Sequence, residues 1–186
     1  MEQQAGLIAG RPLAGTATRA IEVHADDRGS FAEYFVDGVD TGLDPRQWSV
    51  VRSQPGTLRG MHVHLGHDEY ISPIIGHCYV GLYDLRPESP TVGEWALYEL
   101  SAHDPIVLTF ARGTVHGWLV DEPTVHLQAT SSTYTDYGSD DNNGCHWSDP
   151  ELGIPWPFEP TLVAPRAAGF GSLAELRARV LSDVRR

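Results

Sequence analysis

An all-β fold, built as a sandwich or barrel and closed by one C-terminal helix, is predicted by three features of the sequence. Thirteen prolines and nineteen glycines divide the chain into short segments. These segments are rich in Val, Ile, Tyr, Trp and Thr, which favour strands. Helical periodicity is absent until the end of the chain. The combination is typical of antiparallel sheets joined by hairpins, not of strands joined by crossover helices.

Turn residues such as Pro55-Gly56 and Arg112-Gly113 separate the predicted strands. In chain order these strands are Gly29 to Val36, Trp48 to Ser53, Thr57 to His64, Tyr70 to Ile75, Cys78 to Asp84, Gly93 to Leu100, Ile106 to Phe110, Gly117 to Val120 and Thr124 to Ser131.

The C-terminal segment has the signals of a helix over about residues 172–184. Ser172 and Glu175 have the spacing of a capping box, in which each side chain accepts a hydrogen bond from the other residue's backbone. Four apolar side chains then fall on one helical face: Leu173, Leu176, Val180 and Val184. This face is expected to pack on the outside of the sheets.

A chain of 186 residues suits one domain, which we expect to span residues 1–186 with its core at about 20–165. The formal net charge of -12 would repel nucleic acid and anionic lipid, so neither is an expected partner. No secretion signal and no run of 18 apolar residues is present, which predicts a soluble, cytoplasmic protein. The two cysteines, Cys78 and Cys145, have no metal-binding or disulfide spacing.

The segment from Gly56 to Gly76 reads GTLRGMHVHLGHDEYISPIIG, and it fits the pattern G-x5-H-x-H-x4-E-x6-G at every specified position. His62 and His64 lie two residues apart, so a strand would point both to one face, and Glu69 could return from the adjoining strand. The segment from Ala111 to His116 fits P-x-G-x-x-H, except that alanine replaces proline. Both patterns resemble the two motifs of metal-binding cupins.

A divalent metal site formed by His62, His64, Glu69 and His116 is therefore predicted. Imidazole and carboxylate ligands suit Fe, Mn, Ni, Co or Zn. The alternative is that His116 is a hydrogen-bonded core residue and that the His62–His64 pair is a coincidence in a chain with nine histidines. His67 and His126 are expected at the surface or behind the ligands.

Over nearly its full length the chain also resembles the dTDP-4-dehydrorhamnose 3,5-epimerases. The segments that carry the resemblance are DRGSFAE from Asp27, LRGMH from Leu58, DLRPESPTVG from Asp84, HGW from His116 and WSDPELGIPW from Trp147. The resemblance implies a double-stranded β-helix jelly roll (cupin), a homodimer and a dTDP-sugar substrate. It also implies that Arg28, Glu33, Gln47 and Arg59 bind the nucleotide sugar and that His62 is the catalytic base.

Other catalytic positions of that family are replaced. Its lysine, which stabilises an enolate, aligns with Glu69, a glutamine aligns with His64, and the carboxylate that orients the base aligns with Arg166. Its tyrosine falls within Leu127 to Ser131, which has none, although Tyr134 or Tyr137 could serve instead. A bound divalent metal would restore the positive charge lost with the lysine.

The leading hypothesis is a metal-dependent enzyme that acts by proton transfer, as an epimerase or isomerase, on a nucleotide-activated deoxy-ketosugar. Two alternatives use the same scaffold: a metal-dependent oxygenase or lyase with a non-sugar substrate, and a cupin that binds a nucleotide sugar without catalysis. An epimerase that uses His62 without metal ranks below all three, because its base and enolate would lack support.

Overall fold

The computed structural model describes residues 4–36, 42–137 and 143–183. Its strands are β1 (Leu7–Gly10), β2 (Thr16–Ala20), β3 (Val23–Asp26), β4 (Gly29–Ala32), β5 (Gln47–Ser53), β6 (Thr57–Val63), β7 (Glu69–Ile75), β8 (His77–Asp84), β9 (Trp95–Ser101), β10 (Ile106–Phe110), β11 (Thr114–Leu119), β12 (Thr124–Thr130), β13 (Asn143–Gly144) and β14 (Leu162–Val163). The helices are α1 (Tyr134–Tyr137), the 3-10 turn η1 (Pro150–Leu152), α2 (Pro165–Ala168) and α3 (Leu173–Asp183). The predicted all-β class is confirmed.

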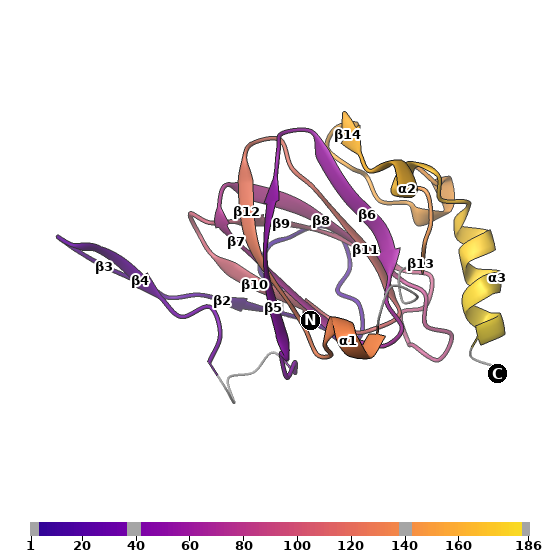
Figure 1. Ribbon diagram of the computed structural model, residues 1–186, viewed down its shortest axis with the longest axis horizontal. Coiled ribbons are helices and arrows are strands. Elements are labelled where there is room, and N and C mark those ends of the chain that lie inside the picture. The colour runs from indigo at the N-terminus through magenta and orange to yellow at the C-terminus, as the bar shows by residue number, and fades with distance from the viewer. Residues whose placement is uncertain (1–3, 37–41, 138–142, 184–186) are drawn as a thin grey trace.

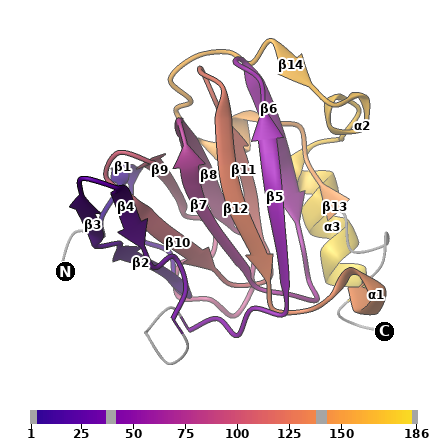
Figure 2. The ribbon, with the colours of Figure 1, turned by 60° about the vertical axis from the view of Figure 1, so that its left-hand side comes forward.

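Two sheets, antiparallel except for the parallel pair β6–β14, face each other as a jelly roll (Figures 1 and 2). The seven-stranded sheet has the order β1-β9-β8-β11-β6-β13, with β14 also pairing with β6. The five-stranded sheet has the order β2-β10-β7-β12-β5. Apolar side chains from both sheets fill the space between them, and Val80, Tyr98 and Leu108 are fully buried there.

Strands β1 and β2 were not predicted, and both join the main sheets. β1 pairs with β9, and β2 pairs with β10 along its whole length. Their sequences, LIAG and TATRA, are short and mix small with polar residues, so the alternation of apolar and polar residues that marks a strand is weak. β4 ends at Ala32, earlier than the predicted end at Val36, and β11 begins at Thr114, earlier than predicted.

Helix α3 packs against the outer face of the seven-stranded sheet. Its first turn contains the predicted capping box, because Ser172 N donates to Glu175 Oε2 at 2.8 Å and Glu175 N donates to Ser172 Oγ at 3.2 Å. Leu173, Leu176 and Val180 are buried against the sheet, as the periodicity predicts. Val184 lies outside the described residues. Within the described ranges, no helix has the length and apolar character needed to cross a membrane.

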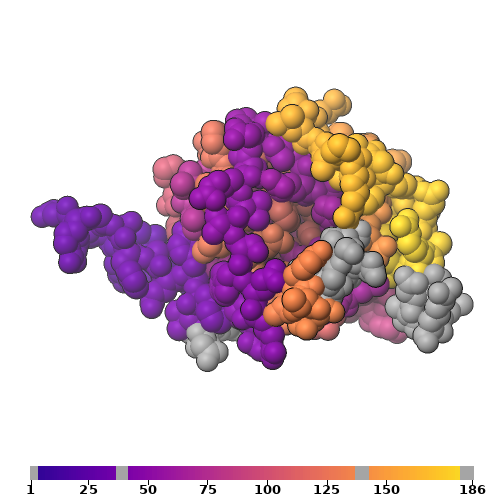
Figure 3. Space-filling model, viewed as in Figure 1, coloured from indigo at the N-terminus to yellow at the C-terminus, as the bar shows by residue number. Residues whose placement is uncertain are grey.

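Strands β3 and β4 form a hairpin, the β3–β4 arm (Val23–Ala32), which projects from the sandwich (Figures 1 and 3). All of β3 and most of β4 are exposed. The arm includes two large apolar side chains, Val23 and Phe31, which are 44% and 61% exposed. A two-stranded hairpin with so little burial is marginally stable by itself, so the arm is suited to contact another surface.

Candidate functional site

The candidate site lies where strands β6 and β11 run side by side and carry two of the predicted histidines. His62 on β6 pairs directly with His116 on β11. Two glycines permit this close approach, since a Cβ atom on Gly60 would lie 2.5 Å from Gly117 Cα and 2.8 Å from the His116 carbonyl oxygen. The glycines thus bring His62 and His116 onto directly paired positions of neighbouring strands.

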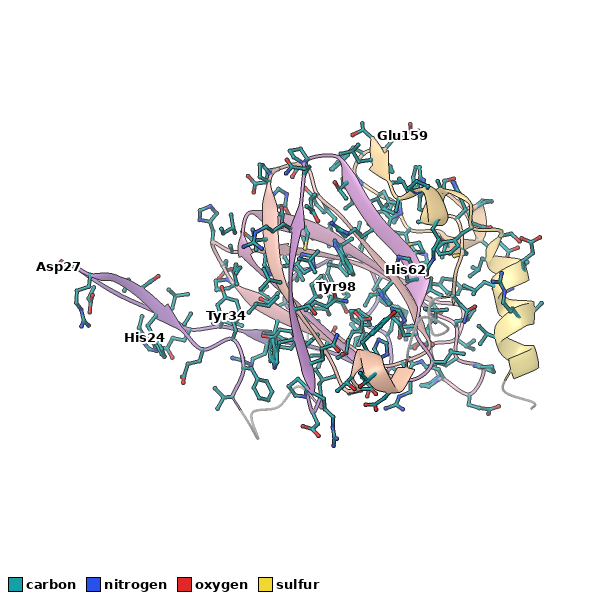
Figure 4. The ribbon with its side chains drawn as sticks, in the orientation of Figure 1. His24, Asp27, Tyr34, His62, Tyr98 and Glu159 are labelled. Atoms are coloured by element: carbon teal, nitrogen blue, oxygen red, sulfur yellow. The ribbon has the colours of Figure 1, made fainter. Side chains whose placement is uncertain are left out.

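A pocket of about 280 Å³ opens between the two sheets at this point. Figure 4 labels His62, which lies on β6. The pocket is lined by Val51, Arg59, His62, His64, His67, Glu69, His116, Trp118, Gln128, Thr130 and Tyr134. The lining thus combines imidazoles, one carboxylate and one guanidinium, which is a composition suited to a polar ligand.

Glu69 is the centre of a buried group that we call the Glu69 cluster, formed by His64, His67, Glu69 and His116. Its Oε1 atom lies 3.3 Å from His64 Nε2, 3.4 Å from His67 Nε2 and 3.6 Å from His116 Nε2. All four side chains are at most 12% exposed. Among the described residues, Oε1 has no hydrogen-bond partner of ordinary geometry, although it is buried.

The charge state of Glu69 follows from its neighbours. Burial alone would raise its pKa, but His116, His67, His64 and the Gln128 amide together hold the pKa of Glu69 well below its usual range. Gln128 Nε2 donates to the other oxygen, Oε2, at 2.9 Å. Glu69 is therefore a carboxylate with one oxygen occupied by a donor and the other directed at three imidazoles.

The neutral imidazole of His116 can present a lone pair toward Glu69. His116 Nδ1 lies 3.0 Å from the Thr114 carbonyl oxygen, which only accepts, so this nitrogen carries the proton and Nε2 has the free lone pair. Ligands bound to one ion at about 2.1 Å lie about 3.0 to 3.4 Å apart. The 3.3 to 3.6 Å separations from Glu69 Oε1 are close to that range. The donors of His64, His67 and Glu69 thus fit a first-row divalent metal.

The geometry brings together two of the four predicted metal ligands, His64 and Glu69, and adds His67, whereas His116 approaches Glu69 from outside this group. Ligand atoms of His64, His67 and Glu69 all lie within 4.8 Å of one another. The ring of His62 stands to the side, with its centroid 6.4 Å from that of His64 and 6.5 Å from that of His116. His67 is 1% exposed, not at the surface. The only sequence signal for His67 as a metal ligand was its position two residues before Glu69.

His62 is a neutral imidazole at physiological pH. Burial, followed by the nearby His116 and His64, lowers the pKa of His62 to about 3. The positive charge of Arg166 contributes to the same lowering of the pKa of His62. The ring of Phe170 contacts both side chains, with its centroid 5.5 Å from the His62 centroid and 5.7 Å from Arg166 Cζ.

The predicted substrate-binding residues separate into two groups. Arg59 lines the pocket and is held by Ser53 Oγ and the Arg52 carbonyl oxygen, each at 3.0 Å. Gln47 lies at the rim, where its Oε1 accepts from the backbone N–H of Tyr134 at 2.8 Å. Arg28 and Glu33 belong to the β3–β4 arm and the residue after it, and neither lines the pocket.

Arg28 is far from the pocket of its own chain because the arm points away from the sandwich. Figure 4 shows this separation between Asp27, at the arm's tip, and His62. The Arg28 side chain is 90% exposed and pairs with Asp26 at 2.6 Å. Any role for Arg28 in a nucleotide-sugar site thus requires a second copy of the chain or a large movement of the arm.

The candidate tyrosines lie in α1, next to the pocket. Tyr134 lines the pocket at its rim and is 55% exposed. The backbone of Tyr137 closes α1, but its side chain lies outside the described residues. Gln128, which the sequence analysis did not single out, stands in the segment where the related enzymes have tyrosine, and it contacts Glu69.

The fold and the site define a small jelly-roll protein with an imidazole-rich pocket between its sheets. The sequence profile of the dTDP-4-dehydrorhamnose 3,5-epimerases matches residues 11–175. The chain therefore belongs to the dTDP-4-dehydrorhamnose 3,5-epimerase family, a family of isomerases.

Similar proteins come from bacteria and archaea. The spore coat polysaccharide biosynthesis protein SpsL of Bacillus subtilis is 31% identical over 147 residues, which cover 78% of this chain and 97% of SpsL. A dTDP-4-dehydrorhamnose 3,5-epimerase of Methanothermobacter thermautotrophicus is 34% identical over 146 residues, covering 74% of this chain and 77% of that enzyme. The Bacillus anthracis enzyme of the same name, solved with TDP and PPi bound, superposes with a TM-score of 0.77 at 28% identity, covering 85% of this chain and 94% of that one.

Proposed function

We propose that this chain is a metal-dependent epimerase or isomerase of a dTDP-linked 4-keto-6-deoxy sugar. The observation that carries the proposal is the buried Oε1 atom of Glu69, which faces three imidazole Nε2 atoms inside the pocket of a nucleotide-sugar epimerase fold. Fe, Mn, Ni, Co and Zn all accept this donor set. Nucleotide sugars are cytoplasmic metabolites, so the enzyme would act in the cytoplasm.

The Glu69 cluster would hold the metal, and His62 would remain free as the base. The sequence pattern assigns His62 both as a metal ligand and as the base, and in this arrangement it acts only as the base. The His62 imidazole, which lines the same pocket beside the cluster, would accept the proton from the carbon next to the ketone. A bound divalent cation would polarise the ketone and stabilise the enolate.

The replacement of lysine by Glu69 supports metal dependence. An enolate oxygen develops negative charge, and a carboxylate at this position would oppose it unless a cation lies between the two. Arg59, at the pocket wall, would bind the diphosphate through charge-assisted hydrogen bonds. Tyr134, at the rim, or Tyr137 would donate a proton or stack on the base of the nucleotide.

The proposed active form is a homodimer in which the β3–β4 arm of one chain reaches the pocket of the other. Its support is the exposed arm, with apolar Phe31 and Val23, and the position of Arg28 far from its own pocket. An arm that crosses to the partner would bring Arg28 and Glu33 to a nucleotide sugar there.

A mixing experiment tests the dimer. Arg28→Ala and His62→Asn should each be inactive alone. Mixed chains should recover activity, because a His62-containing pocket of the first variant can receive the intact arm of the second. Chains that co-assemble without any recovery would contradict a shared site.

The metal-dependent activity is tested by solvent exchange. Protein purified without chelator should contain close to one transition metal per chain. It should incorporate deuterium from solvent next to the ketone of a dTDP-4-keto-6-deoxy sugar, and chelation should abolish this. A protein that contains metal but shows neither deuterium exchange nor nucleotide binding would favour the oxygenase or lyase. Tight binding of the nucleotide sugar without turnover would favour a binding protein.

A further inference from the structure

Gln128 and Glu69 form a contact between two neighbouring strands of the five-stranded sheet. Thr130 on β12 lies directly opposite Glu69 on β7, and Gln128 stands two residues before Thr130. Gln128 is therefore the diagonal neighbour of Glu69 on the same face of the sheet, within reach of a long side chain. Its Nε2 atom donates to Glu69 Oε2 at 2.9 Å.

This hydrogen bond makes the two carboxylate oxygens of Glu69 different. Oε2 is engaged by the Gln128 amide, whereas Oε1 faces the three imidazoles of the Glu69 cluster. An amide donor satisfies one buried oxygen without adding charge. The other oxygen is then oriented toward the position where a metal would bind, which favours ligation through one oxygen.

The two residues also stand at two replaced positions of the family. Glu69 aligns with the lysine, and Gln128 falls in the segment that contains the tyrosine. In this structure the two side chains are in direct contact. A carboxylate placed at the first position needs a donor to orient it, and a glutamine at the second position supplies that donor.

We infer that Gln128 is a positioning residue, which holds Glu69 as a single-oxygen metal ligand. This inference rests on the proposed metal site, and it extends the site to a residue that neither the cupin motifs nor the family pattern includes. Hydrogen bonds that orient metal ligands commonly change metal affinity by about 10- to 100-fold.

The test uses the full chain with Gln128→Leu, which removes the donor at similar volume. The matched control is Gln54→Leu, the same change in the exposed turn between β5 and β6. Co(II) affinity is measured by competition with a chelator, and the visible spectrum of the Co(II) protein reports the coordination. We expect an affinity loss of about 10- to 100-fold and an altered spectrum for Gln128→Leu alone.

Unchanged affinity and an unchanged spectrum in Gln128→Leu would overturn the inference. If that variant does not fold, Gln128→Met, with an unbranched side chain, replaces it in the same two measurements. A wild-type chain that binds no Co(II) would instead refute the proposed metal site. Failure of the positioning role and failure of the metal site are therefore distinguishable.

Discussion

Replacement of Glu69 by Gln removes the only anionic ligand of the Glu69 cluster at nearly constant volume. Loss of a supporting hydrogen bond alone weakens metal binding by about 10- to 100-fold, so loss of the charged ligand should weaken it by about 100-fold or more. A metal at 1,000 times its Kd stabilises the folded state by about 4.1 kcal/mol. A 100-fold weaker site at the same metal concentration would give about 1.4 kcal/mol.

The expected difference of about 2.7 kcal/mol is measurable as a melting temperature. For a chain of this size, 1 kcal/mol corresponds to about 2–4 °C, so metal should raise the Tm of Glu69→Gln by about 5–11 °C less than that of wild type. The assay is thermal unfolding with and without metal. Glu159→Gln, the same change at the exposed position labelled in Figure 4, is the control. Equal metal-induced shifts in wild type and Glu69→Gln would refute the role of Glu69.

Three further predictions concern other parts of the molecule. His62→Asn should retain its metal but lose deuterium exchange, because the His62 imidazole acts as the base beside the Glu69 cluster. Metal content is measured by elemental analysis, and loss of metal from this variant would show that His62 is a ligand. Arg59→Ala should lose the thermal stabilisation that millimolar thymidine diphosphate gives to wild type, while its metal content stays unchanged. An equal rise in Tm with the nucleotide in this variant would show that the diphosphate binds elsewhere. Ser172→Ala should lower the free energy of unfolding by about 1 kcal/mol, because it removes the hydroxyl that accepts a hydrogen bond from Glu175 N at the start of α3. Thermal unfolding identical to that of wild type would contradict this prediction.

The convergence of His64, Glu69 and His116 could be predicted from the sequence, because strand periodicity and motif spacing determine it. His67 could not, because it lies four residues beyond the end of β6, whereas His64 is the first residue after that strand. His62 was placed in the ligand set by the same periodicity, but a shared face does not determine distance. Its ring lies 6.4 Å from that of His64.

The place of Arg28 and Glu33 could not be predicted for a different reason. Their assignment came from family positions, and a family position carries no information about which chain contributes the residue. In the structure, the β3–β4 arm leaves the sandwich instead of folding over its own pocket. Gln128 was missed because an amide has no motif of its own, and its role depends on a diagonal contact with Glu69.

The most direct test of the account is the variant Glu69→Lys, since the family pattern and the metal site assign this position opposite charges. Metal content and solvent deuterium incorporation into a dTDP-4-keto-6-deoxy sugar are measured together for wild type and variant. An ammonium group in place of the carboxylate would repel a divalent cation held by His64, His67 and His116. We therefore predict that the variant loses both metal and exchange. A metal-free variant with faster exchange than wild type would show instead that the pocket is an ordinary epimerase site in need of a lysine.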